Sequence, residues 1–534
     1  MESILRASVN DRLEGSNSKI NSSTMMRLKD IYLGSIDAKN ELLANSPDER
    51  ARFAASFVVP PNLTIDEFIN REKYYVLGLK GTGKTALLRY ISIRLEEVDK
   101  AYSSFVLFKS EIDEDMRADF GKTARLLFAT ANPESFEGTD FEAIWRWFIY
   151  RKIVEAVTSN RSSPFQDNSR WEEFRALVLS EAMKSKPTGL MRLVPRLKKG
   201  QIELSKDPKL SLDLEWDSKG TARMKFVDLV RKADAVFADL QPSDSRLNLF
   251  FDELELSYSA DSQYDRDVRM LRDLIVSIEK INGVGKAKGF ALCLYAAIRS
   301  EVLSAVASLG KEINKPLSDF GTEILWNRPG HDASRQPLIY IIEQRLASAR
   351  GEHNMKPIKS AELWSAYFPA QLEKMAPQRY ILHQTWYRPR DVVRLLRSAQ
   401  EQFPNEVGFT SHVFENIRKK YSTACWVEVT EEMKTRYSSL GIDGIKKLLY
   451  GIRPPVSARF LEDRLAKLRR EHAEVEHLAK KASAQALIAD LFRIGVLGNT
   501  ANGNMRWSFR GDDEVLPEQS LVIHNALRSY LSIQ

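Results

Sequence analysis

The stretch YYVLGLKGTGKT, residues 74–85, decides the fold class of this 534-residue chain. Four apolar residues that favour β-structure run directly into glycines, and the apolar residues of 86–98 then recur at helical spacing. A short buried strand that passes through glycines into a helix is typical of a parallel α/β sheet. Residues 78–85 also fit the pattern Gly-x4-Gly-Lys-[Ser/Thr], in which backbone N–H groups converge on phosphate oxygens. The stretch therefore predicts a phosphate-binding loop between a strand and a helix.

This loop predicts a site for ATP and Mg²⁺. Lys84 is expected to reach the β and γ phosphates, and Thr85 to offer its hydroxyl to the metal ion. The residues expected to contact the nucleotide lie in the loop or at the start of the next helix: Gly78, Lys80, Gly81, Thr82, Gly83, Lys84, Thr85 and Ala86. The alternative is a glycine turn that fits the pattern by chance. It is disfavoured because a strand and a helix flank the motif, as phosphate binding requires.

A second motif, LNLFFDE at 247–253, ends an apolar run in two carboxylates. In a P-loop enzyme, an aspartate at the end of such a strand holds Mg²⁺ through water, and the next glutamate polarises the attacking water. Asp252 is therefore the expected Walker B aspartate and metal contact, and Glu253 the expected general base. Acidic residues also occur at strand ends simply because they favour contact with water. The loop at 78–85 nevertheless favours the catalytic interpretation.

Two arginines are candidate sensors of the γ-phosphate. The apolar run 290–297 predicts another buried strand, and Arg299 follows it. In P-loop ATPases that have a strand between the P-loop and Walker B strands, such a strand ends in a polar residue that senses the γ-phosphate, and Arg299 could take that place. Arg390 lies in WYRPRD (386–391), where a proline opens an apolar helical run and an arginine can swing onto the phosphate. Each has a plainer alternative: a surface arginine at a strand end for Arg299, and helix capping with Asp391 for Arg390.

Strand and helix alternation predicts an α/β fold: a P-loop NTPase core of parallel sheet and flanking helices. The run 105–108 completes a first β-α-β unit. The Walker motifs are farther apart than a compact core needs, which indicates an insertion of helices and a small hairpin. We expect four parts: a helical lead-in (1–50), the ATPase core (51–345, insertion at about 115–240), a helical lid with connecting helices (346–482), and a winged-helix-like domain (483–534) that ends in a helix at 520–531.

Composition excludes several classes of protein. Lysines and arginines number 79 against 72 aspartates and glutamates, so the net charge of +7 permits a nucleic-acid partner without requiring one. The two cysteines, Cys293 and Cys425, form no CxxC pair, and the histidines form no ligand pair, so neither a disulfide framework nor a zinc module is expected. No apolar leader or membrane-length apolar run occurs. We therefore expect a cytoplasmic protein without a membrane partner.

Nucleic-acid binding rests on two weaker signals. The tract 184–199 is basic without acidic dilution and is a candidate for contact with DNA or RNA. The tract 464–481 is interleaved with acids, so we interpret it as a solvated helix. Arg506, Trp507 and Arg510 of the expected wing could also contact DNA.

The chain resembles a family of bacterial P-loop ATPases related to the STAND and origin-recognition (AAA+) ATPases, often found in antiphage defence loci. The resemblance rests on FxxxFVVPP, VLGLKGTGKTALLRYIS, FFDELE, AIRSEVL, YRPRDVVRLL and the terminal IGVLG, WSFRGD and LVIHNAL. It implies an ATP-binding core, a helical lid with an arginine sensor, here Arg390, and a C-terminal winged helix. The strand before Arg299 lacks the Asn or Thr usual in AAA+ proteins, and no arginine-finger motif is clear; Arg299 and Arg345 are the candidates.

Three hypotheses remain open. The first is an ATP-dependent switch with slow hydrolysis, whose closed form assembles as a homo-oligomer or engages an effector protein, in antiphage defence. The second is a DNA-engaging ATPase, like an initiator or loader, that uses the winged helix and the tract 184–199. The third is a nucleotide-stabilised scaffold without turnover. Phosphate release and the salt dependence of DNA binding discriminate among them.

Overall fold

The computed structural model describes residues 25–41, 46–99, 101–107, 141–160, 162–179, 197–198, 201–205, 221–254, 261–300, 303, 306, 313–330, 332–434 and 436–533. These residues form two compact units. The sheet unit contains Ala38–Arg50 and Val59–Trp326. The helical unit contains the described residues up to Asp37, Ala51–Val58 and those from Asn327 onward.

The sheet unit is built on five parallel strands in the order β2-β6-β7-β1-β8. The strands are β1 (Tyr75–Gly78), β2 (Tyr102–Leu107), β6 (Leu247–Asp252), β7 (Leu292–Arg299) and β8 (Gly321–Glu323). The α/β fold with a parallel sheet is therefore confirmed, and four of these strands coincide with the predicted apolar runs. β8 was not predicted because its three residues, Gly-Thr-Glu, carry no apolar signal.

Continuous burial explains why these strands stand out in the sequence. All six residues of β6 and seven of eight in β7 are buried. Parallel strands are covered by helices on both faces, so they are apolar throughout instead of alternating. The Phe250 ring at the centre stacks on Phe105 and Tyr295, with 4.8 Å between centroids in each case. The middle of the sheet is thus an aromatic core that holds the strand ends in register.

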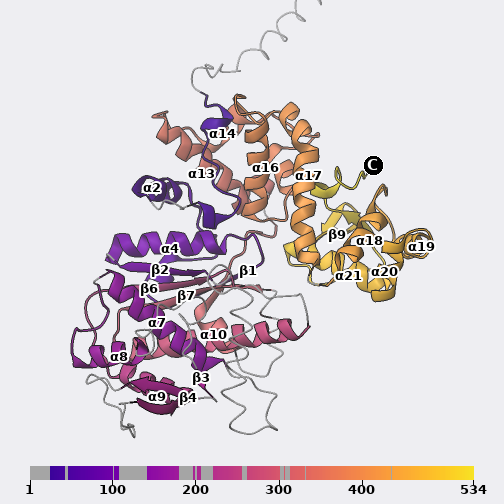
Figure 1. Ribbon diagram of the computed structural model, residues 1–534. Helices are drawn as coiled ribbons and strands as arrows, with labels where there is room; N and C mark the ends of the chain where they lie inside the picture. The colour runs from indigo at the N-terminus through magenta and orange to yellow at the C-terminus, as the bar shows by residue number, and fades with distance from the viewer. Residues whose placement is uncertain are drawn as a thin grey trace, which may run out of the picture. The chain divides into compact units, whose positions relative to one another are not determined.

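Helices cover both faces of the sheet (Figure 1). α4 (Lys84–Asp99) follows β1, α10 (Asp261–Lys288) joins β6 to β7, and α12 (Asn314–Phe320) precedes β8; α3 (Ile65–Ile69) lies before β1. Between β2 and β6 come α7 (Glu142–Asn160), α8 (Ser169–Leu179), the antiparallel β3 (Leu197–Lys198), β4 (Gln201–Ser205) and β5 (Thr221–Lys225), and α9 (Phe226–Ala238). Helices and a small antiparallel sheet therefore occupy the stretch that was predicted to be an insertion.

The helical unit contains α2 (Pro47–Ser56) in part and a long run of further helices. They are α13 (Pro337–Glu352), α14 (Ser360–Tyr367), α15 (Pro377–His383), α16 (Pro389–Gln402), α17 (Ser411–Met433), α18 (Ser439–Leu449), α19 (Ala458–Leu468), α20 (Ala473–Lys481) and α21 (Ala484–Ile494). α16 begins at Pro389, as its sequence predicts, and buries Val392, Leu395 and Leu396. This region is helical, in agreement with the prediction.

The chain ends in a three-stranded antiparallel sheet in the order β10-β9-β11. Its strands are β9 (Leu497–Ala501), β10 (Asn504–Arg506) and β11 (Ser520–Ile523). The helix expected at 520–531 is wrong. Leu521 and Ile523 are buried in alternation with their neighbours and pair with β9, so this segment is a strand, followed by the short helix η7 (Asn525–Leu527).

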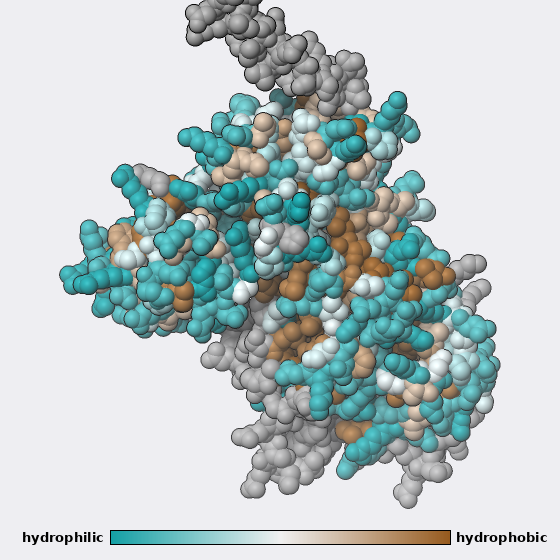
Figure 2. Space-filling view, turned by 180° about the vertical axis from the view of Figure 1, so that it is seen from behind, coloured by the Kyte–Doolittle hydropathy of each residue, from teal (hydrophilic) through white to brown (hydrophobic). Residues whose placement is uncertain are grey.

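Hydrophilic residues cover most of the face seen in Figure 2. Among the helices that the structure describes, none has both the length and the hydropathy that a membrane span requires.

Candidate functional site

The turn between β1 and α4, residues 78–84, is here called the glycine loop. Gly81 and Gly83 have φ values of +84° and +94°, a region that favours glycine. A Cβ atom on Gly78 would lie 2.7 Å from the Thr82 hydroxyl oxygen. Three glycines are thus required by the backbone path itself. The loop leads into the first turn of α4, whose N–H groups have no partner within the helix and favour an anion.

Side chains hold the glycine loop closed. The Lys84 ammonium donates to the carbonyl oxygens of Gly78 and Leu79, both at 2.8 Å. The Thr82 hydroxyl donates to the Leu79 carbonyl at 2.8 Å, and the Trp326 indole N–H donates to the Thr82 carbonyl at 2.8 Å. Trp326 was not predicted as a site residue, because it lies 242 positions along the chain from the loop and no local motif marks it.

Asp252 ends β6 beside the glycine loop and is 3% exposed. Its Oδ1 accepts the Glu253 backbone N–H at 2.8 Å, whereas its buried Oδ2 has no hydrogen-bond partner. Burial raises the pKa of Asp252, and the Thr85 hydroxyl, the Glu253 N–H and the Lys84 charge oppose this rise. The fold therefore brings together Asp252, Thr85 and Lys84 and leaves one carboxylate oxygen of Asp252 without a hydrogen-bond partner.

Asp252 also acts on an arginine that the sequence analysis missed. Burial lowers the pKa of Arg89 on α4, and the Asp252 carboxylate opposes that shift. The Arg89 guanidinium lies 3.8 Å from the centroid of the Phe105 ring. Its position in α4, five residues after Lys84, is the only sequence signal that could have suggested it.

Glu253 has a φ of +60°, an unusual conformation for a residue with a side chain. Such backbone strain clusters at functional sites, where surrounding structure maintains it. The Glu253 carboxylate accepts a hydrogen bond from the Lys39 ammonium at 3.0 Å, and the two side chains are 12% and 37% exposed. Lys39 lies in the short helix η3 (Ala38–Asn40), the first segment of the chain that belongs to the sheet unit. Nothing in the local sequence around Lys39 indicated this partner.

Arg299 ends β7 at the same sheet edge. β7 lies between β1 and β6, and Arg299 is the register partner of Gly78. The next residue, Ser300, donates its hydroxyl hydrogen bond to Glu323 of β8 at 3.1 Å. The sheet unit thus places Arg299 beside the start of the glycine loop.

Arg390 belongs to the helical unit, where it joins a network of ion pairs between α16 and α17. It pairs with Glu428 at 3.0 Å, and Arg394 binds the same carboxylate at 2.8 Å. Asp391 is 1% exposed and accepts the Trp386 N–H at 3.2 Å; burial raises its pKa while Arg388 and Arg394 oppose the rise. The network stabilises the start of α16.

Arg345, an arginine-finger candidate, is 8% exposed, and its guanidinium lies 5.1 Å from the centroid of the Tyr32 ring. A finger must reach another molecule, and this buried packing position counts against that role.

The wing residues considered for DNA contact have other neighbours. Arg506 pairs with Asp512 at 3.0 Å, Trp507 is 5% exposed, and Arg510 lies 4.7 Å from the centroid of the Tyr387 ring. The basic tract 184–199 lies outside the described residues, apart from the backbone of Leu197–Lys198.

No group of three or more His, Cys, Asp or Glu side chains that could hold a metal ion occurs within the described ranges. A hydroxyl and a single carboxylate suit Mg²⁺, which keeps several waters and takes other ligands from phosphates.

A comparison with protein families identifies one match: residues 337–429 fit the model of the FunZ-associated C-terminal helical domain. The matched segment runs from the start of α13 into α17 and includes the Arg390 network. A search of curated proteins finds no match to the chain. The family match therefore concerns part of the helical unit alone.

Proposed function

We propose that the chain is a P-loop ATPase that acts as a molecular switch. One observation carries the proposal: the buried, unpartnered Oδ2 of Asp252, at the end of β6, beside Thr85, Lys84 and the glycine loop. Leaving a buried carboxylate oxygen without a partner costs free energy, so such an atom calls for a ligand.

The glycine loop supplies the phosphate site. The Lys84 ammonium donates to the Gly78 and Leu79 carbonyl oxygens at 2.8 Å, and these neutral acceptors do not cancel its positive charge. Phosphate oxygens are stronger, charged acceptors, so Lys84 exchanges these carbonyls for the β and γ phosphates when ATP binds. The backbone N–H groups of the loop and of α4 complete the cradle.

Thr85 and Asp252 are the residues that would hold Mg²⁺. Their donor set fits, since a hydroxyl and an unsatisfied carboxylate oxygen are the hard ligands that the ion prefers. Bound Mg²⁺ would neutralise charge that develops on the β and γ phosphates. Glu253 is the proposed general base that polarises the attacking water.

The order of the strands supports Arg299 as the sensor on the sheet unit. β7 lies between β1 and β6, and Arg299 is level with Gly78. Arg390 is the proposed sensor of the helical lid. To reach the γ-phosphate it would have to exchange Glu428, its partner at 3.0 Å, for phosphate, which is a stronger acceptor. α21 and the sheet β10-β9-β11 form the proposed winged helix.

The proposed biological role is control of an effector, with the closed form assembling as a homo-oligomer in bacterial antiphage defence. The resemblance of the site and lid motifs to that group of ATPases supports this role. The match of residues 337–429 to the FunZ-associated C-terminal helical domain is the second observation that supports this role.

A DNA-engaging ATPase remains the second candidate because of the basic tract 184–199 and the C-terminal sheet. This candidate is the weaker one because Arg506 pairs with Asp512 and Trp507 is buried. The two are separated by measuring Mg·ATP binding, phosphate release and size with and without ATP, alongside duplex binding between about 50 and about 300 mM salt. Failure to bind ATP would exclude both, and tight binding without turnover would favour a scaffold.

Lys39 is expected to restrain Glu253, because its ammonium binds the carboxylate that must turn to the attacking water. Lys39→Ala should raise the rate of phosphate release about fivefold, which corresponds to about 1 kcal/mol for a partly exposed ion pair. Lys39→Arg preserves the charge and should remain near the wild-type rate. An unchanged or slower rate in Lys39→Ala would mean that Lys39 does not restrain the base.

Asp252→Asn is expected to stabilise the nucleotide-free protein while abolishing Mg²⁺-dependent turnover. Burial raises the pKa of Asp252, so its charge costs stability above that pKa and the cost disappears as the pH falls through it. The melting temperature of the variant should exceed that of the wild type by on the order of a few °C at pH 7.5, with a smaller difference at an acidic pH at which Asp252 binds a proton. A lower melting temperature at both pH values would contradict this assignment.

A further inference from the structure

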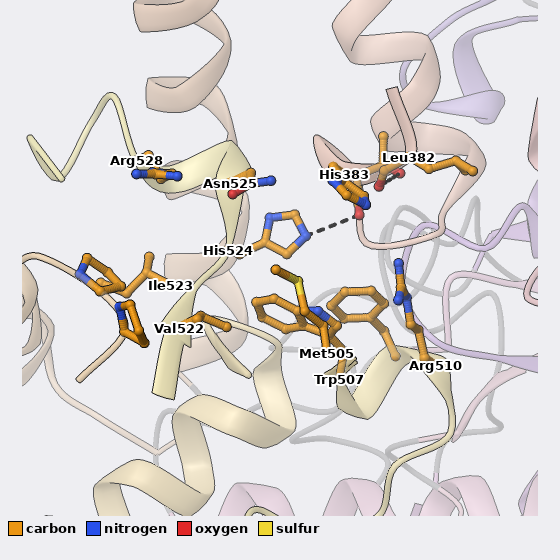
Figure 3. Close-up of a pocket in the computed structure, with 14 residues that line it drawn as sticks. Leu382, His383, Met505, Trp507, Arg510, Val522, Ile523, His524, Asn525 and Arg528 are labelled. Carbon is orange, nitrogen blue, oxygen red and sulfur yellow. Dashed lines mark hydrogen bonds between the residues drawn. The ribbon is translucent and has the colours of Figure 1, made fainter. Parts of the chain in front are cut away.

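The helical unit contains a pocket of about 110 Å³. None of the residues proposed for the ATP site lines this pocket. Its walls come from four segments: residues 382–385 at the end of α15 and just after it, Pro454–Pro455, residues 505–510 from β10 and the short helix η6 (Ser508–Arg510), and residues 522–528 (Figure 3). All of these belong to one compact unit. The pocket is therefore a feature of the helical unit alone.

Flat rings form one wall of this pocket. Trp507 and Phe509 stack with 5.3 Å between centroids, and the His524 ring packs edge-on against them at 5.2 and 5.5 Å. Met505 is 46% exposed at the pocket, and Pro454–Pro455 add an apolar side. Such a lining suits a flat ring.

The His524 ring is fixed in orientation and protonation. Its Nδ1 accepts the Ala526 N–H at 3.2 Å, which leaves Nε2 to donate to the Thr385 carbonyl at 3.1 Å (Figure 3). Burial, then Arg388 and Arg510, lower the pKa of His524 to about 3; burial, Arg510 and Arg379 lower that of His383 to about 4. Both imidazoles are neutral at physiological pH, so the arginines supply the charge of the pocket.

That charge is positive and is not balanced by acids in the lining. Arg510 and Arg528 line the pocket, and none of its lining residues is Asp or Glu. Arg510 donates to the Tyr387 hydroxyl at 3.0 Å, and its buried Nε has no acceptor. Within the described part of the chain, Arg510 forms no ion pair with a carboxylate. A guanidinium in this state is suited to bind phosphate.

We propose that this pocket binds one nucleotide, with its base against the Trp507 and Phe509 wall and its phosphate at Arg510. The ligand class combines the two features of the lining: flat apolar rings and a guanidinium without a carboxylate partner in the lining. The nucleotide is either free or one residue of a single strand, since both present the same chemistry. This site is separate from the glycine loop and does not depend on the proposed ATPase activity.

The test is calorimetric titration of the full chain with AMP, adenosine, inorganic phosphate and a four-residue oligo(dA). Arg510→Gln should weaken AMP or oligonucleotide binding at least tenfold, while Arg493→Gln, an exposed arginine of α21 outside the pocket, should leave it unchanged. AMP binding identifies the free nucleotide as ligand, and binding of the oligonucleotide alone identifies a strand. Because the glycine loop is intact in these variants, binding that persists in Arg510→Gln belongs elsewhere.

A second pair of variants tests the proposal even if Arg510→Gln fails to fold. Met505 is exposed, so Met505→Glu and Met505→Lys disturb no core but place opposite charges at the pocket. Met505→Glu should weaken binding of the phosphate-bearing probes severalfold relative to Met505→Lys. Equal affinities in the two variants, adenosine binding as tight as AMP, or no probe binding that Arg510→Gln removes would overturn the proposal.

Discussion

Lys84→Ala is expected to abolish ATP binding at micromolar concentrations and to reduce phosphate release at least 100-fold. The Lys84 ammonium donates to two carbonyl oxygens of the glycine loop, both at 2.8 Å, and so lies at the proposed phosphate position. A charge-assisted contact with two phosphates contributes about 3 kcal/mol, which corresponds to a factor of about 100. Equilibrium titration with a fluorescent ATP analogue and a phosphate-release assay measure both effects.

The matched control for this variant is Lys286→Ala, an exposed lysine on α10 of the same unit. It removes one positive charge without touching the glycine loop and should bind ATP as the wild type does. Circular dichroism should show that both variants are folded. If Lys84→Ala bound ATP with wild-type affinity, the assignment of the loop as a phosphate site would be wrong.

Glu253→Gln is expected to stop turnover and keep ATP binding. Glutamine preserves the size of the side chain and its hydrogen bond from Lys39, but it cannot take a proton from water. Loss of a general base reduces phosphate release about 10² to 10⁴-fold. The variant should therefore trap the ATP-bound form, so a switch that assembles would accumulate its assembled state in light scattering.

Glu97→Gln is the control for the base, because Glu97 is an exposed carboxylate on α4 that pairs with Arg94. Its turnover should equal that of the wild type. Equal phosphate release by Glu253→Gln and the wild type would remove Glu253 from the mechanism while leaving the binding site intact. Loss of ATP binding in Glu253→Gln would instead assign the residue to binding.

The glycine loop could be predicted from the sequence because its residues are consecutive. Gly78, Gly81, Gly83, Lys84 and Thr85 lie within eight positions, and their spacing alone defines a backbone path that only glycines permit. Asp252 and Glu253 could be predicted because a buried parallel strand leaves a continuous apolar run in the sequence.

The final segment shows where pattern reasoning reached its limit. Residues 520–523, Ser-Leu-Val-Ile, are too few to separate helical spacing from strand alternation. Pairing with β9 through Val522 and Ile523 makes them a strand. A tertiary contact, not local preference, decides this element.

The sequence by itself determined the α/β class, the glycine loop and the carboxylates at the end of β6, because each is encoded in a short run of residues. Only the tertiary structure decided that Lys39 binds Glu253, that Trp326 holds Thr82, and that Arg510 borders an aromatic pocket. These contacts join segments far apart in the chain, and their free energy depends on burial and distance, which no local pattern of residues records.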